Sequence, residues 1–117
     1  MNDQALVLDM KDLLRNAGDD RELLDELADT FVEEVPGWIG RLRAAVSSGD
    51  TGETFSVAHS LNGAVAFFKA AAVQRAAAEL EAMGLAARLD GAPERLDRLE
   101  AHLRELVEVL RAAPWRR

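Results

Sequence analysis

Hydrophobic residues recur every three or four positions along most of this 117-residue chain, which is the spacing of one face of an α-helix. Strict alternation of apolar and polar residues, the pattern of a half-buried β-strand, does not occur. Ala, Leu, Arg and Glu are abundant, and all four are good helix formers. The pattern therefore predicts an all-α protein.

The N-terminal half of the chain contains two predicted helical segments. The first covers about residues 4–16. The helix stops before Gly18, which readily adopts a left-handed conformation. The second begins near Asp20 and continues to Val35 with apolar residues three and four positions apart. Pro36 then leaves two alternatives open, a kink in a continuing helix or a new helix with Pro36 in its first turn.

Three further segments are separated by turn and capping residues. Asp50 followed by Glu53 has the form of a capping box, which predicts a helix from about Thr51 to about Lys69. Two more segments follow, over residues 70–84 or a few residues longer, and over residues 95–113. Amphipathic helices joined by short turns bury their stripes by packing nearly antiparallel. We therefore expect an antiparallel four-helix bundle with an additional short N-terminal helix.

Composition limits the classes of function. The length fits a single domain over residues 1–117, with a bundle core at about 20–112. A net charge of −7 argues against a nucleic-acid partner, because phosphate neutralisation requires clustered Lys and Arg. The acidic start and the lack of a long apolar run predict a cytoplasmic protein with no membrane partner.

The sequence also lacks the usual motifs for cofactors. It has no cysteine, so thiolate metal sites and disulfides are excluded. Its two histidines, His59 and His102, lie on separate segments, and no Gly-rich phosphate loop occurs. We therefore expect no metal site, no nucleotide and no bound cofactor. His102 is interpreted as a structural or solvated residue of the last helix.

One segment combines a core stripe with an off-stripe histidine. The residues predicted to face the core are Thr54, Ala58, Leu61, Val65 and Phe68. His59 lies on a different face, and Gly63, one turn later, removes the side chain that would cover it. Gly in a helix costs about 0.5–1 kcal/mol relative to Ala, so a compensating role is expected. The alternative is that Gly63 admits a neighbouring helix and that His59 is an ordinary surface histidine.

The stretch "AHSLNGAVAFFKA" resembles the signature of the histidine-containing phosphotransfer (HPt) family, whose core reads A-H-x-L-K-G. The residues that match in place are Ala58, His59, Leu61, Gly63, Ala64, Phe68 and Ala70. The flanking sequence is similar as well, with an acidic pair before Pro36 and an L-E-x-x-G motif at residues 80–84. The family fold is a helical bundle that exposes the histidine, which agrees with the architecture expected from periodicity.

The resemblance implies a phosphorelay function. His59 would accept a phosphoryl group from a receiver-domain aspartate or a hybrid kinase, and would pass it to a response regulator. Expected partners are therefore response-regulator receiver domains and a sensor or hybrid histidine kinase. The receiver would supply Mg²⁺, and no ATP-dependent kinase activity is expected. The docking residues would be Phe55, Gly63 and Ala66, with Val57 or Phe67 as further alternatives.

Two departures from the family pattern open a second hypothesis. Asn62 stands where the family usually has lysine, and Lys69 where it usually has glycine. Asn62 can donate hydrogen bonds to a phosphoryl group but carries no positive charge. Lys69 lies too far along the helix to replace that lysine, and Arg75 is an alternative source of charge. The chain could thus be a transfer-impaired, receiver-binding adaptor.

A kinase dimerisation domain is disfavoured, because its H-E-x-x-x-P pattern is absent.

The two tryptophans are assigned to no site. Trp38 is expected to pack in the core or at its boundary, two residues after Pro36. Trp115 belongs to a basic C-terminal tail, "WRR", for which poor order is expected.

Overall fold

The computed structural model describes residues 8–116, and within this range every regular element is helical. The elements are α2 (Met10–Asn16), α3 (Arg21–Ser48), α4 (Thr51–Ala66), α5 (Ala71–Leu85), α6 (Ala92–Ala112) and the 3₁₀ helix η1 (Pro114–Arg116). The predicted all-α fold is confirmed. Within the described range, no helix is both long and apolar enough to cross a membrane.

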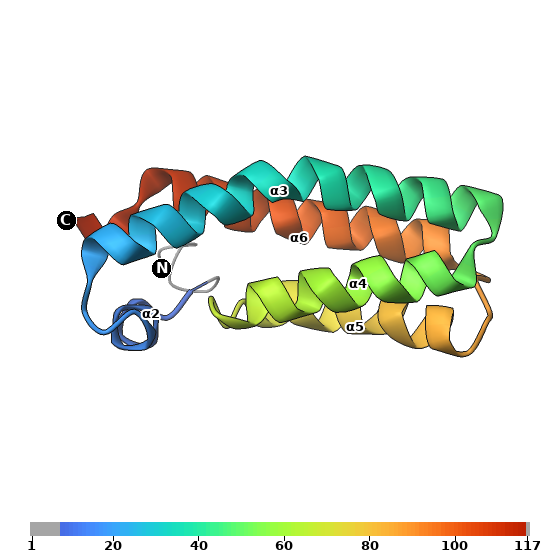
Figure 1. Cartoon of the computed structure of the whole chain (residues 1–117), viewed down its shortest axis with the longest axis horizontal. Helices are drawn as coiled ribbons and strands as arrows, with labels where there is room; N and C mark the ends of the chain where they lie inside the picture. The colour runs from blue at the N-terminus through green and yellow to red at the C-terminus, as the bar shows by residue number, and fades with distance from the viewer. Residues whose placement is uncertain (1–7, 117) are drawn as a thin grey trace.

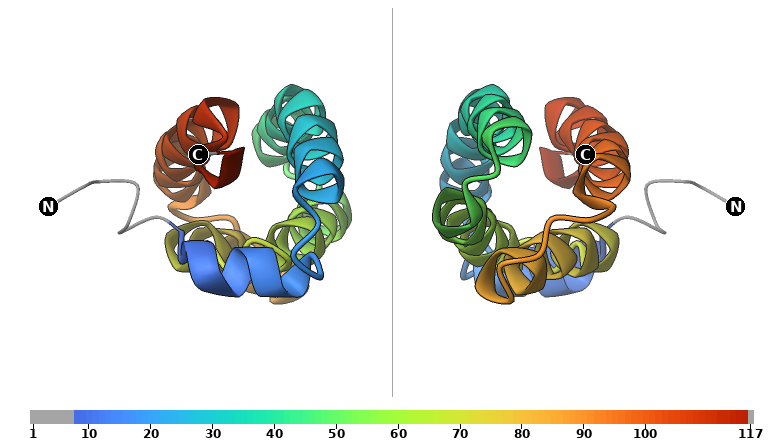
Figure 2. Two further views of the ribbon diagram at one scale, coloured as in Figure 1. Left: turned by 90° about the vertical axis from the view of Figure 1, so that its left-hand side faces the viewer. Right: turned by 90° about the vertical axis from the view of Figure 1, so that its right-hand side faces the viewer.

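The helices α3 to α6 form an antiparallel bundle, and the short helix α2 lies across one end of it (Figure 1). The end-on views of Figure 2 show α3 and α6 on one side of the bundle and α4 and α5 on the other. The largest fully buried side chains of the core are Leu13, Leu24, Leu42, Val57, Leu61, Val65, Val73, Leu80, Leu96, Leu99, Leu103 and Leu106. The expected bundle with a short N-terminal helix is thus confirmed.

The first helix, α2, begins later than the predicted segment. Asp9 is its N-cap, and the Asp9 carboxylate accepts hydrogen bonds from two backbone N–H groups of the first turn. The helix therefore starts at Met10, and residues 4–7 of the prediction lie outside the described residues. Gly18 has a φ of 65°, the left-handed conformation that the sequence predicts.

Helix α3 runs through Pro36 without a break, so the alternative of a new helix at this residue is wrong. Proline removes one backbone N–H, which leaves the carbonyl of residue 32 without its helical donor. Pro36 is exposed, and water can take the place of that donor. Trp38 is buried, and its ring centroid lies 5.4 Å from that of Phe31, so the expected core packing is confirmed.

Helix α4 has the predicted start and an earlier end. The Asp50 carboxylate accepts a hydrogen bond of 3.0 Å from the backbone N–H of Glu53. The reciprocal half of the box is not formed, because the Asp50 N–H donates to the carbonyl of Ala45. The helix ends at Ala66 and not at Lys69, whose φ of 52° is left-handed and cannot continue a right-handed helix.

The last two long helices fit their predictions to within a few residues. Helix α5 ends at Leu85, one residue past Gly84. Helix α6 begins at Ala92, three residues before the predicted residue 95. Pro93 occupies its first turn, where the missing N–H costs no helical hydrogen bond.

The C-terminal tail is ordered as far as the described residues extend, so the expectation for Trp115 is wrong. Trp115 is 2% exposed, and its indole N–H donates a 2.7 Å hydrogen bond to Asp25 of α3. Arg116 donates to the same carboxylate oxygen at 2.8 Å, and Arg21 donates to the Trp115 carbonyl at 2.6 Å. These contacts join residues at least 90 positions apart in the sequence, which local composition does not reveal.

Candidate phosphotransfer site

His59 lies on the outer surface of α4, away from the core. Its side chain is 68% exposed. All members of the predicted core stripe are buried, namely Thr54, Ala58, Leu61, Val65 and Phe68. The helical spacing therefore separates the two faces as predicted, with the apolar stripe inside and the imidazole outside.

An aromatic ring from the preceding turn supports the imidazole. The rings of Phe55 and His59 are stacked, with centroids 5.6 Å apart and an interplanar angle of 13°. Residues four positions apart lie one above the other on a helix, which is why the two side chains meet. The half-buried Phe55 covers one face of the ring and limits the orientations that the imidazole adopts.

A carboxylate from the neighbouring helix contacts the imidazole. Oε2 of Glu81, on α5, lies 3.3 Å from Nδ1 of His59. The other oxygen, Oε1, is buried and has no hydrogen-bond partner among the described residues. The sequence analysis does not select Glu81 as a site residue. The available signal was the L-E-x-x-G motif, in which Glu81 is the acidic residue.

Gly84 explains why Glu81 reaches the histidine. A Cβ atom at Gly84 would lie 2.6 Å from the backbone nitrogen of Phe55 and 2.8 Å from the carbonyl oxygen of Thr51. Both atoms belong to α4, so only glycine permits this approach of the two backbones. Glu81 lies one turn before the contact, and His59 one turn after it along α4. The glycine thus sets the separation of the helices at the site.

Gly63 has the opposite environment. A Cβ atom at this position would have no neighbour within 4 Å among the described residues. The alternative that Gly63 admits a neighbouring helix of this chain is therefore wrong. The open space at Gly63 agrees with the expectation that no side chain at this position covers His59. Asn62, the preceding residue, is half-buried on the same turn of α4.

The other candidate docking residues differ in how exposed they are. Ala66 is exposed on α4, and Phe67, in the turn that follows, is half-buried. Val57 is 1% exposed and belongs to the core, so its assignment as a docking residue is wrong. The turns of α5 around Glu81 add two exposed small side chains that the sequence analysis did not select, Ala78 and Ala82.

The two cationic side chains considered as replacements for the family's lysine, Lys69 and Arg75, do not lie at the His59 site. Lys69 pairs with Asp12 of α2, with a nitrogen–oxygen distance of 3.8 Å. Arg75 lines a hollow of about 370 Å³ together with Lys69 and His102. The lining residues of this hollow come from α5, α6, the turn before α5 and the segment before α2, and none comes from α4. Neither cation therefore shares a site with His59, and half-buried His102 is separate from it.

Comparisons with known proteins agree with this geometry. The family model of the Hpt domain matches residues 26–113. The chain is also similar to the crystal structure of histidine-containing phosphotransfer protein B (HptB) from Pseudomonas aeruginosa PAO1. The TM-score is 0.86 and the sequence identity 23%, over 95% of this chain and 96% of that one, which demonstrates a shared fold. No curated protein matches the sequence. Because the family model covers most of the chain, including His59, this protein belongs to the Hpt domain family.

Proposed function

We propose that this chain is a phosphorelay carrier that uses His59 as its phosphorylated residue. His59 accepts a phosphoryl group from the aspartate of a receiver domain or from a hybrid kinase, and passes it to a response regulator. The observation that carries the proposal is an exposed imidazole held between the Phe55 ring and the Glu81 carboxylate. Family membership supports the same chemistry.

The contact with Glu81 selects the reacting nitrogen. A carboxylate 3.3 Å from Nδ1 favours the tautomer that carries its proton on that nitrogen. The lone pair then resides on Nε2, which is the nucleophile. During transfer the P–O bond to the donor aspartate breaks and the P–N bond to Nε2 forms. The aspartate leaves as a carboxylate, and the imidazole becomes a positively charged phosphoimidazolium.

Glu81 stabilises the product of this step. The proton stays on Nδ1, so the ring gains a positive charge next to the Glu81 carboxylate. No general base is needed, because the imidazole attacks in its neutral form. In-line positioning and charge neutralisation dominate phosphoryl transfer. The receiver partner would supply Mg²⁺ and its own acidic residues, so this chain requires no cofactor.

The surroundings of His59 suit a flat partner surface. Gly63, Ala66, Ala78 and Ala82 are exposed and have small or no side chains, so a receiver domain can approach closely. Phe55 adds apolar contact area next to the histidine. We assign this surface of α4 and α5 to receiver docking.

The central experiment is transfer from a phosphorylated receiver domain. Wild-type chain should acquire an acid-labile, base-stable label, and His59→Gln should acquire none. His102→Gln is the matched control, because it removes the other histidine and should be labelled like the wild type. Absence of label with every cognate receiver tested would disprove the carrier function.

A receiver-binding adaptor with impaired transfer is the second candidate, and Asn62 favours it. The charge that the family usually places one turn after the histidine is missing there. The adaptor hypothesis expects wild-type chain to bind a receiver with little label. It also expects Asn62→Lys to increase the transfer rate or the lifetime of phosphohistidine. Efficient transfer by the wild type, unchanged in Asn62→Lys, would exclude the adaptor and show that charge at this position is unnecessary.

A further inference from the structure

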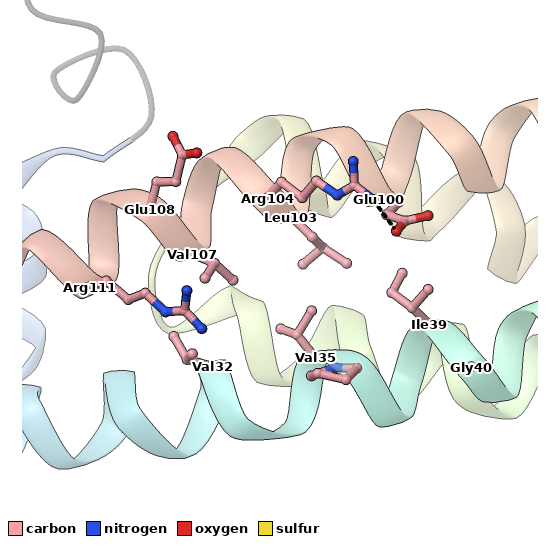
Figure 3. Close-up of a pocket in the computed structure, with 11 residues that line it drawn as sticks. Val32, Val35, Ile39, Gly40, Glu100, Leu103, Arg104, Val107, Glu108 and Arg111 are labelled. Atoms are coloured by element: carbon pink, nitrogen blue, oxygen red, sulfur yellow. Dashed lines mark hydrogen bonds and ion pairs between the residues drawn. The ribbon is translucent and has the colours of Figure 1, made fainter.

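A hollow of about 530 Å³ lies between α3 and α6 (Figure 3). These two helices lie on the side of the bundle opposite α4 and α5, and His59 belongs to α4 (Figure 2). Figure 3 shows Val35 and Ile39 of α3 directed toward Leu103 and Val107 of α6 across this hollow. Its centre is thus apolar. Charged lining residues come from α6 alone, namely Glu100, Arg104, Glu108 and Arg111. We call this surface the α3–α6 groove.

Two glycines on α3 lie at the groove or next to it. Gly40 lines it, and Gly37 is exposed one residue after Pro36. A Cβ atom at either position would have no neighbour within 4 Å among the described residues. Glycine inside a helix costs about 1 kcal/mol relative to alanine. Packing within residues 8–116 does not offset that cost, whereas close approach of a helix from another molecule would.

The charges on the α6 rim are self-complementary. Read along the helix, Glu100, Arg104, Glu108 and Arg111 alternate in sign. When a second α6 helix lies antiparallel to the first, Glu100 of one helix is opposite Arg111 of the other, and Arg104 is opposite Glu108. A twofold interface requires this property, because each residue must meet its counterpart on an identical surface. A parallel alignment in register would instead place like charges together.

We propose that the α3–α6 groove binds the same groove of a second copy of this chain, with the two α6 helices antiparallel. The twofold axis passes between Arg104 and Glu108. Each interface then contains two Arg104–Glu108 pairs around the apolar centre at Val107. Within residues 8–116, no ion pair of the single chain involves Glu108 or Arg111.

The α3 side of the groove fits the same axis. Arg43 of α3 pairs with Asp97 and Glu100 of α6. Because the two helices are antiparallel, a residue of α3 and the residue of α6 that lies at the same height have numbers that add to about 142. The axis between Arg104 and Glu108 therefore crosses α3 near Pro36. Antiparallel α3 helices would then place Val32 of one copy opposite Gly40 of the other. The glycine provides space for the valine.

The proposed dimer does not depend on the phosphorelay function. His59 belongs to α4, and α4 and α5 lie on the side of the bundle opposite α3 and α6, which form the groove (Figure 2). Both copies would keep their histidine surfaces open to partner domains. Dimerisation and phosphotransfer can therefore be measured and lost separately.

Charge reversal tests the proposal by sedimentation equilibrium over a range of concentrations. Glu108→Arg or Arg104→Glu places like charges together twice per dimer, so each should raise the dimer Kd at least about tenfold. The double variant restores the pairs and should return the Kd to within about threefold of wild type. Arg98→Glu is the matched control, because Arg98 is exposed on α6 outside the groove, and it should leave the Kd unchanged.

Gly40→Leu is a second, steric test. Gly40 is exposed and an added Cβ atom meets no neighbour within 4 Å among the described residues, so circular dichroism should show full helicity and normal thermal unfolding at low concentration. It should nevertheless raise the dimer Kd at least about tenfold, by filling the space opposite Val32. A wild-type chain that stays monomeric up to about 1 mM would overturn the proposal. A dimer that is insensitive to both tests would overturn it as well.

Discussion

The two sides of the bundle differ in how closely their helices approach. On the α4–α5 side, Gly84 brings the two backbones into direct contact. On the α3–α6 side, the helices leave a groove of about 530 Å³. Charge follows the same division, since α3 and α6 carry nine Asp, Glu, Lys or Arg residues each, whereas α4 carries one and α5 three. The histidine thus occupies the tightly packed, sparsely charged side.

Under the proposed carrier function, this difference shows how the scaffold positions a histidine that must stay exposed. The imidazole must be exposed, so it cannot be positioned by burial. Stacking on Phe55 and contact with Glu81 position it instead, and both depend on a fixed separation of α4 and α5. Charged side chains around the site would have to be desolvated when a partner binds, which opposes association.

The largest expected effects come from matched leucine truncations on the two sides. Leu61 of α4 and Leu103 of α6 are both 0% exposed. Leu61→Ala should lower the free energy of unfolding by about 4 kcal/mol, because the enclosed cavity cannot collapse. Leu103→Ala should lower it by only about 2–3 kcal/mol, since the space merges with the groove. Urea denaturation measures both, and a larger loss at Leu103 would contradict the comparison.

A glycine pair tests the difference in backbone approach. Gly84→Ala should lower the free energy of unfolding by about 1–3 kcal/mol, because the new Cβ meets backbone atoms of α4 that cannot rotate away. Gly40→Ala should raise it by about 0.5–1 kcal/mol, through helix propensity alone. Thermal unfolding at a concentration where the chain is monomeric compares the two. Equal effects of the same sign would show that the backbone contact is unimportant.

The contribution of Glu81 is expected to be smaller and specific to chemistry. Glu81→Gln keeps the shape of the side chain but removes the negative charge next to Nδ1. The loss of one charge-assisted contact, about 1 kcal/mol, corresponds to about fivefold slower phosphorylation of His59. Rapid-quench transfer from a phosphorylated receiver measures this rate. Glu79→Gln, on the exposed surface of the same helix, is the control and should transfer at the wild-type rate.

The smallest predicted effect is on stability at low pH, through Asp25 of α3. Hydrogen bonds from Arg116 and Trp115 lower the pKa of Asp25 below its ordinary range. A carboxyl whose pKa is lower in the folded state stabilises the fold above the unfolded pKa, which is about 4. That contribution is lost as the pH falls through the folded pKa. Asp25→Asn should therefore lose less stability than wild type between pH 6 and pH 3, measured by urea unfolding.

The control for this prediction is Asp90→Asn, which removes an exposed carboxyl between α5 and α6. Its stability should fall between pH 6 and pH 3 as much as that of the wild type. An equal flattening in both variants would show that the effect comes from net charge and not from the contacts of Asp25.

Helical periodicity was sufficient to predict the fold and the exposure of the histidine. The core stripe of α4 could be predicted because burial depends on spacing within a single helix. Glu81 and Gly84 could not be assigned their roles in this way, because both act across the α4–α5 contact. Gly63 and Gly84 look alike in the sequence, and only their neighbours in space distinguish an open position from a backbone contact.

The ends of elements were predicted less well than their cores. Lys69 is a helix-compatible residue in an apolar context, so the local sequence contains no signal for its left-handed φ of 52°. A position after a proline and before two arginines predicts poor order for Trp115. Its burial depends on Asp25, at the other end of the chain, and so follows from the closed bundle and not from the tail.

The backbone contact at Gly84 also restricts how the length of the chain can change. Each residue inserted in a helix rotates everything beyond it by about 100°. One residue added between Glu81 and Gly84 would turn the carboxylate away from His59 while the glycine kept its place against α4. The loop of residues 86–91 carries no such constraint. Homologues should therefore accept insertions after α5 far more readily than within its last turn.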